Sequence, residues 1–142
     1  MTHRILVVED DLMNAKLFEM ILGRKAGYDV AVTEDPEFVV EAARGGEIDL
    51  IVMDVSLSNS TWEGQPVDGL AITRMLKADP TARMVPVLLA TAHAMKGSKE
   101  KFLAESGADD YVSKPIVSSD ELISRVKTLL ETRGHALPPA AR

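Results

Sequence analysis

Acidic, hydroxyl and basic residues stand at the ends of four apolar runs in this chain. Glu9 and Asp10 follow the first run, Asp54 follows the third, Thr91 ends the fourth and Lys114 follows the last. If these runs are parallel strands of one sheet, their carboxyl ends meet at a single edge. Three carboxylates crowded there repel one another and favour a shared cation. Carboxylate oxygens suit a hard divalent ion such as Mg²⁺, and a hydroxyl and an ammonium group can bind a phosphoryl group.

The apolar runs have the features of strands that are covered on both faces. They are short and partly β-branched, and their apolar residues follow one another instead of alternating with polar residues, as in parallel sheets. The predicted strands are Ile5–Val8, Asp29–Val32, Leu50–Met53, Val85–Ala90 and Asp110–Val112.

The segments between these runs show helical spacing of apolar residues and helix-end signals. Asp35-Pro36 and Ser118 to Glu121 are typical of helix starts, Ser98 can cap another helix, and Gly27 and Gly45-Gly46 are typical of helix ends. The first helix places Met13, Leu17, Phe18, Ile21 and Leu22 on one predicted core face. The predicted helices lie at 12–26, 36–45, 69–78, 98–106 and from 119 to the start of the tail at Gly134.

Strand and helix therefore alternate through the chain as (βα)5. This order predicts the α/β class, with a doubly wound parallel sheet of five strands in the flavodoxin-like order 2-1-3-4-5. Residues 1–133 are expected to form one domain, and residues 134–142, which include Pro138-Pro139, a disordered tail.

Bulk composition excludes several classes of protein. At 142 residues the chain is long enough for one well-buried domain, and its net charge of −6 argues against broad nucleic-acid binding. The absence of cysteine excludes disulfides and thiolate chemistry. There is no room for a signal peptide before the first strand and no apolar run of membrane-spanning length, so we expect a cytoplasmic protein without membrane contact.

Four motifs, by their order and spacing together, resemble the receiver domain of the two-component response-regulator family across residues 4–132. The motifs are Ile5-Leu6-Val7-Val8-Glu9-Asp10, Asp49-Leu50-Ile51-Val52-Met53-Asp54, Leu89-Ala90-Thr91-Ala92 and Tyr111-Val112-Ser113-Lys114-Pro115. The resemblance implies that Asp54 accepts a phosphoryl group from a histidine kinase or a histidine phosphotransfer protein. It further implies that Glu9, Asp10, Asp54 and the backbone carbonyl of Ser56 hold Mg²⁺, that Thr91 and Lys114 contact the phosphoryl oxygens, and that Tyr111 moves with Thr91 as a switch.

Two of these signals also have a plainer interpretation. An acidic triplet at 9–11 can offset a helix dipole, and Tyr111 can be an ordinary strand aromatic.

The favoured function is a stand-alone receiver that signals to a downstream protein target by phosphorylation-dependent contact, as a monomer or weak dimer. No enzyme activity is expected beyond its own phosphotransfer and dephosphorylation. The alternatives are a degenerate receiver that binds partners without phosphorylation, and a Mg²⁺-dependent aspartyl phosphohydrolase, which would want an aspartate where Ser56 stands.

The chain departs from the family pattern after Asp54. Gly69 follows only after a long polar segment, residues 57–68, which is expected to be a loop insertion without further elements. Trp62 in this insertion, the one tryptophan, could contact a partner or pack on the domain surface, and His93 beside Thr91 could tune dephosphorylation. The Lys114-Pro115 bond is a candidate cis bond, and the surface from Met95 to Lys127 is a candidate output face.

Overall fold

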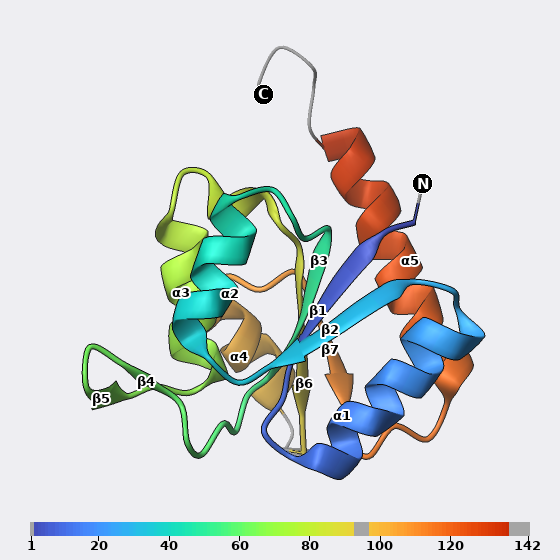
Figure 1. Cartoon of the computed structure of the whole chain (residues 1–142), viewed down its shortest axis with the longest axis horizontal. Coiled ribbons are helices and arrows are strands. Elements are labelled where there is room, and N and C mark those ends of the chain that lie inside the picture. Colours follow the sequence, from blue (N-terminus) through green and yellow to red (C-terminus); the bar gives the residue numbers. More distant parts are fainter. Residues whose placement is uncertain (1, 93–96, 137–142) are drawn as a thin grey trace.

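The computed structural model of the chain describes residues 2–92 and 97–136 and contains a five-stranded parallel sheet (Figure 1). The strand order is β2-β1-β3-β6-β7, which is the predicted order 2-1-3-4-5 once the two short strands of the insertion are set aside. The sheet strands are β1 (Arg4–Val8), β2 (Asp29–Thr33), β3 (Leu50–Asp54), β6 (Val87–Thr91) and β7 (Asp110–Ser113).

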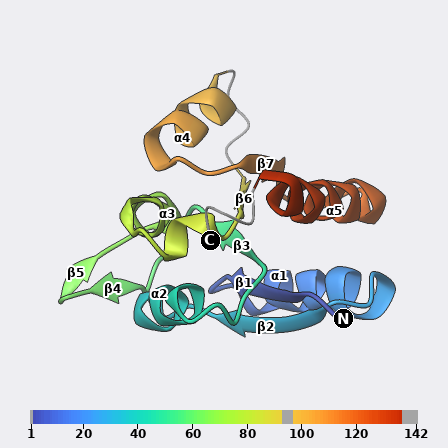
Figure 2. The ribbon, with the colours of Figure 1, turned by 90° about the horizontal axis from the view of Figure 1, so that it is seen from above.

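Helices lie on both faces of this sheet, as a doubly wound fold requires (Figures 1 and 2). The first helix begins as an α-helix and continues with π-helical turns to Lys25. The helical elements are α1 (Leu12–Phe18), η1 (Glu19–Lys25), α2 (Pro36–Arg44), α3 (Gly69–Ala78), the 3-10 turn η2 (Ala82–Met84), α4 (Ser98–Ser106) and α5 (Ser119–Ala136). None of the helices in the described segments combines the length and hydropathy needed to cross a membrane.

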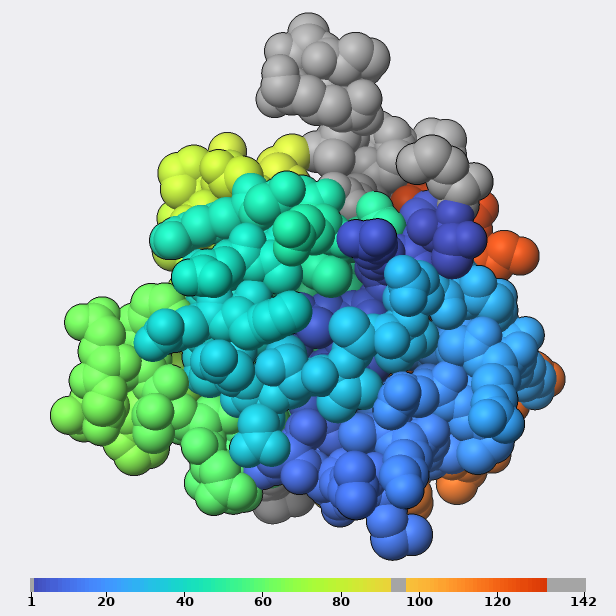
Figure 3. Space-filling model, in the orientation of Figure 1, coloured from blue at the N-terminus to red at the C-terminus, as the bar shows by residue number. Residues whose placement is uncertain are grey.

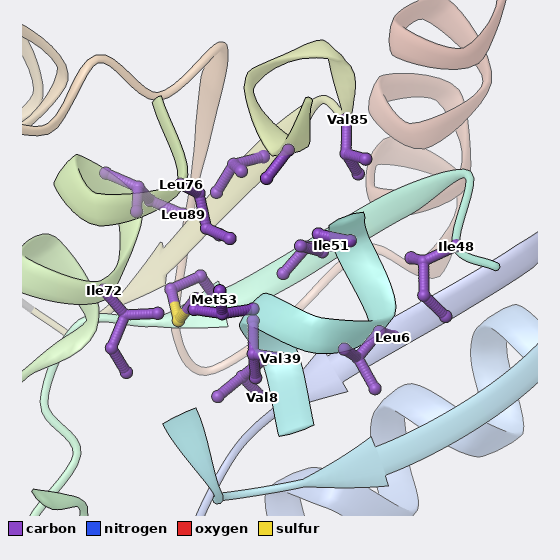
Figure 4. Packing of buried hydrophobic residues seen from close by; sticks show 14 of the residues in the cluster. Leu6, Val8, Val39, Ile48, Ile51, Met53, Ile72, Leu76, Val85 and Leu89 are labelled. Carbon is purple, nitrogen blue, oxygen red and sulfur yellow. The ribbon is translucent and has the colours of Figure 1, made fainter. Parts of the chain in front are cut away.

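Successive strand residues pack on opposite faces of the sheet and form two cores. Leu6 and Val8 of β1 belong to the core under α2, α3 and α4, which is shown in Figure 4. Ile5 and Val7 belong to the core under α1, η1 and α5. Because both faces are covered at the centre of the sheet, Ile5–Val8 of β1 and the whole of β3 and β6 are buried, which explains their continuous apolar sequences. The edge strand β2 is exposed or half-buried along its length.

Helix ends follow the capping signals in most cases. Asp11, Asp35 and Asp68 each accept hydrogen bonds from the first turn of the helix that follows, and Ser118 accepts one from the backbone N–H of Glu121. The expected cap at Ser98 is wrong: the N-cap is Gly97, with a φ of 86°, and Ser98 is the first helical residue.

Three further predictions about the elements need correction. Met13 does not join the core and is 81% exposed, because it lies in the first turn of α1, past the strand ends. The fourth strand begins at Val87 rather than Val85, since the N–H of Val85 closes the turn η2 by bonding to Ala82. Helix α5 continues through Gly134 to Ala136.

The insertion is not a plain loop. It forms a hairpin of β4 (Thr61–Trp62) and β5 (Gln65–Pro66), which projects from the side of the molecule (Figure 3). Glu63 and Gly64, the two linking residues, both have positive φ, as in a type I′ turn. The expectation of a segment without further elements is therefore wrong.

Candidate functional site

The three acidic residues after β1 have different roles, one at the start of α1 and the others at the edge of the sheet. Asp11 caps α1, where its carboxylate accepts the backbone N–H groups of Met13 and Asn14. Glu9 is buried at the sheet edge, and its backbone N–H bonds to the carbonyl of Thr33 on β2. The dipole interpretation is correct for Asp11, whereas Glu9 and Asp10 are available to the site.

Asp54 is the last residue of β3 and is only 3% exposed. Its position is fixed by the start of α3, where the N–H of Gly69 bonds to the carbonyl of Val55. A Cβ added to Gly69 would lie 2.0 Å from the carbonyl oxygen of Asp54, so any side chain there would force the backbone to move. Glycine is therefore strongly favoured at the point where the long insertion rejoins the fold.

Lys114 links the acidic residues. Its Nζ donates to Glu9 Oε1 at 3.1 Å and to Asp54 Oδ1 at 3.0 Å, and its side chain is 12% exposed. The residue follows β7, and the Lys114-Pro115 bond is cis, as anticipated. Burial acts to lower the pKa of Lys114, but the two carboxylates outweigh it and raise that pKa, so the ammonium stays charged.

Thr91 ends β6 and is fully buried. It lies one residue beyond Ala90, which pairs with Asp54 in the sheet register. Its carbonyl accepts the backbone N–H of Lys114 at 2.8 Å. The ends of four adjacent strands, β1, β3, β6 and β7, therefore bring the hydroxyl, the acidic residues and the ammonium to one edge of the sheet.

Glu9 is the most perturbed acid of the cluster. Burial, together with the neighbouring Asp54 carboxyl, raises the pKa of Glu9 to about 7, although the Asp11 N–H and Lys114 act in the opposite direction. Without a metal the cluster thus lowers its charge by holding a proton on Glu9 below this pH.

Asp10 behaves differently because Ser58 holds it. Both the backbone N–H and the hydroxyl of Ser58 donate to Asp10 Oδ2, at 2.8 and 2.6 Å. Burial alone would raise the pKa of Asp10, but these hydrogen bonds lower it below the usual value. Sequence reasoning missed Ser58, since no motif marks a serine in a polar loop.

Each of the remaining candidates that the structure describes has its own contacts. The backbone N–H of Ser56 donates to Asp54 Oδ1 at 3.3 Å. Tyr111 is buried in the core under α2, α3 and α4, and Trp62 is partly buried against the same core, with its indole N–H donating to Glu63. His93 and Met95 lie outside the described residues.

The three carboxylates fit a divalent metal. Glu9, Asp10 and Asp54 each offer one oxygen, and these atoms all lie within 4.8 Å of one another. Hard oxygen donors at this spacing suit Mg²⁺, whose remaining positions are commonly filled by water and carbonyl oxygen.

The chain belongs to the response-regulator receiver family: the family model for the response regulator receiver domain matches residues 5–127. The fold, with its five-stranded order, is the fold of that family.

Among individual proteins, the chain is similar to the polar-differentiation response regulator DivK of Brucella ovis. The two are 36% identical over 130 residues, which cover 92% of this chain and 98% of DivK. A solved structure with the same fold is the receiver domain of the sensor histidine kinase PA1611 from Pseudomonas aeruginosa, described with a magnesium ion coordinated in its active site cleft. It has a TM-score of 0.76 and 31% identity, and the match covers 92% of this chain and 99% of that one.

Proposed function

We propose that Asp54 accepts a phosphoryl group in a Mg²⁺-dependent step, and that the phosphorylated domain signals by binding a downstream protein. The donor would be the phosphohistidine of a histidine kinase or a phosphotransfer protein. The observation that carries this proposal is the position of Lys114, whose Nζ bridges Glu9 and Asp54 at the edge where Thr91 also lies.

The residues divide the chemistry among them. A carboxylate oxygen of Asp54 attacks the phosphorus in line with the leaving histidine nitrogen, so a P–O bond forms as the P–N bond breaks. Lys114 neutralises charge on the transferred group, and the Thr91 hydroxyl donates to one of its oxygens. Bound Mg²⁺, held by Glu9, Asp10, Asp54 and the carbonyl of Ser56, would supply further charge neutralisation.

The new phosphoryl dianion draws Thr91 toward it, and Tyr111 follows as the switch residue. Tyr111 is well placed for this role because it lies two strand residues before Ser113, the sheet partner of Thr91. Receiver-domain response regulators signal through phosphorylation rather than through turnover of a substrate.

The domain would comprise residues 1–133 and act as a stand-alone receiver in the cytoplasm. Its partners are proteins, as its net charge of −6 opposes nucleic-acid binding. Trp62 and the output surface around α4, β7 and α5 are the segments that we propose for partner choice.

The proposal is tested by incubating the protein with Mg²⁺ and a small phosphodonor such as acetyl phosphate. Intact mass spectrometry should show one added phosphoryl group that is stable in acid and labile in base, and chelation of Mg²⁺ should prevent its formation. Turnover of general phosphate esters, or a phosphoryl group mapped to another residue, would contradict the proposal.

Mg²⁺ affinity should rise with pH because binding needs the Glu9 carboxylate. In the metal-free protein the pKa of Glu9 is raised to about 7, so below that pH each bound ion must displace a proton. The apparent dissociation constant should fall about tenfold between about pH 6 and about pH 8. Calorimetric titrations across this range measure the effect.

Glu9→Gln is the control for that titration. It removes the titrating group, so its weaker Mg²⁺ binding should show no comparable change over the same range. The free energy of unfolding of the metal-free protein should change in the opposite direction. Between about pH 4.5 and about pH 7 Glu9 keeps its proton in the folded chain and loses it in the unfolded chain, so stability should fall as pH rises through this range. A flat affinity profile in the wild type would refute the prediction.

A further inference from the structure

The three carboxylates of the site are held by two different partners. Lys114 contacts Glu9 and Asp54, both of which are buried. Asp10 is only partly buried, and its two side-chain hydrogen bonds come from Ser58, 48 positions further along the chain. Asp10 is therefore tied to the insertion, whereas the other two acids are tied to the sheet.

The geometry of this contact leaves one oxygen of Asp10 outside it. Both donors of Ser58, the N–H at 2.8 Å and the hydroxyl at 2.6 Å, end on Oδ2. Such a pair fixes the plane of the carboxylate while Oδ1 is not part of the contact. The rotation of this carboxylate is already restricted before a metal arrives. Its other oxygen can therefore coordinate the metal with little further loss of conformational entropy.

Ser58 itself comes from an anchored part of the insertion. Leu57 beside it is buried in the core under α2, α3 and α4. Ser60 donates its hydroxyl to the carbonyl of Glu34 at 2.6 Å and accepts the N–H of Val67 through its own carbonyl. The donors that reach Asp10 thus stand on a segment that is fixed on both sides.

We propose that Ser58 is a positioning residue of the metal site, which holds the Asp10 carboxylate ready to bind Mg²⁺ and so couples the inserted segment to that site. This inference rests on the proposed function, in which Asp10 is a metal ligand. Through Ser58, the insertion would contribute to the Mg²⁺ affinity of the site.

The test compares Mg²⁺ affinity, measured by calorimetry at about pH 8, among four proteins. Ser58→Ala removes one of the two donors and should weaken binding about tenfold, the lower end of the range for groups that orient metal ligands. Ser58→Thr keeps the hydroxyl and should restore near wild-type affinity. Ser60→Ala removes an anchor of the same segment that does not touch Asp10, and it should leave Mg²⁺ affinity close to that of the wild type.

A second measurement reports on the contact itself without metal. In nuclear magnetic resonance spectra of the metal-free protein, the Ser58 amide proton should resonate downfield and shift upfield in Asp10→Asn, because that change removes the charged acceptor. Thermal unfolding in a chelator should show that all variants are folded.

The outcomes separate this inference from the function on which it rests. Wild-type protein that binds no Mg²⁺ would contradict the proposed metal site. Wild-type binding with unchanged affinity in Ser58→Ala would contradict only the role of Ser58. Equal weakening in Ser58→Ala and Ser60→Ala would also overturn that role, because general loosening of the insertion would then explain both.

Discussion

Asp54→Asn should accept no phosphoryl group from acetyl phosphate, and without metal it should be more stable than the wild type. The amide oxygen and nitrogen are too weakly nucleophilic to form the acyl phosphate, so intact mass spectrometry should show no addition. The stability gain follows from the crowding at the sheet edge. Asp54 is buried beside Glu9 and helps to raise its pKa, so removing one negative charge relieves repulsion.

We expect the gain in the free energy of unfolding at about pH 8 to be about 1 kcal/mol, roughly the energy of a shift of one pKa unit. Lys114 keeps Glu9 as its charged partner in this variant, and the repulsion between the Glu9 and Asp54 carboxylates is removed. Denaturant unfolding in the presence of a chelator measures it. Asp11→Asn is the matched control: Asp11 caps α1 and asparagine is an equally good cap, so both phosphorylation and stability should be preserved. If Asp54→Asn were phosphorylated to the same level as the wild type, Asp54 could not be the acceptor.

Gly69→Ala should lower the free energy of unfolding by about 3 kcal/mol, which is the upper part of the usual range for overpacking. The new Cβ would lie 2.0 Å from the carbonyl oxygen of Asp54 and 2.8 Å from its carbonyl carbon, so either α3 or the end of β3 must move. In a domain of this size the melting temperature should fall by roughly 10 °C.

The same displacement should slow phosphoryl acceptance, because it moves the backbone that carries the nucleophile. Gly23→Ala is the control, since a Cβ there meets only ordinary contacts, the nearest at 3.7 Å from Val30, and alanine favours helical backbone. An alanine at position 69 that leaves both melting temperature and phosphorylation rate unchanged would contradict the close packing of Gly69 against Asp54.

The sequence allowed the sheet and its order to be predicted because the signals were local and repeated. Each strand is a short apolar run, each crossover carries a helix, and parallel connections leave few topologies. The position of Glu9, Asp54 and Lys114 at one edge follows directly from that order. Proximity of the side chains was therefore predictable even though their contacts were not.

The parts that sequence did not predict depend on contacts between distant segments. The hairpin β4–β5 has strands of only two residues, one containing Pro66, which is too short for a strand pattern. The Glu63-Gly64 pair was the available signal, since a glycine in a two-residue link favours a type I′ turn. The bond from Ser58 to Asp10 spans 48 positions and exists only once the fold has formed.

Lys114 reaches Asp54 across 60 positions of the chain and Glu9 across 105. A growing chain therefore presents all three acids before the one ammonium that neutralises two of them has been synthesised. No fragment that ends before β7 can hold the site in its balanced form. Docking of β7 then brings Lys114 to Glu9 and Asp54 and reduces the repulsion between the carboxylates. Mg²⁺ binding should therefore report folding of the whole domain rather than of any part.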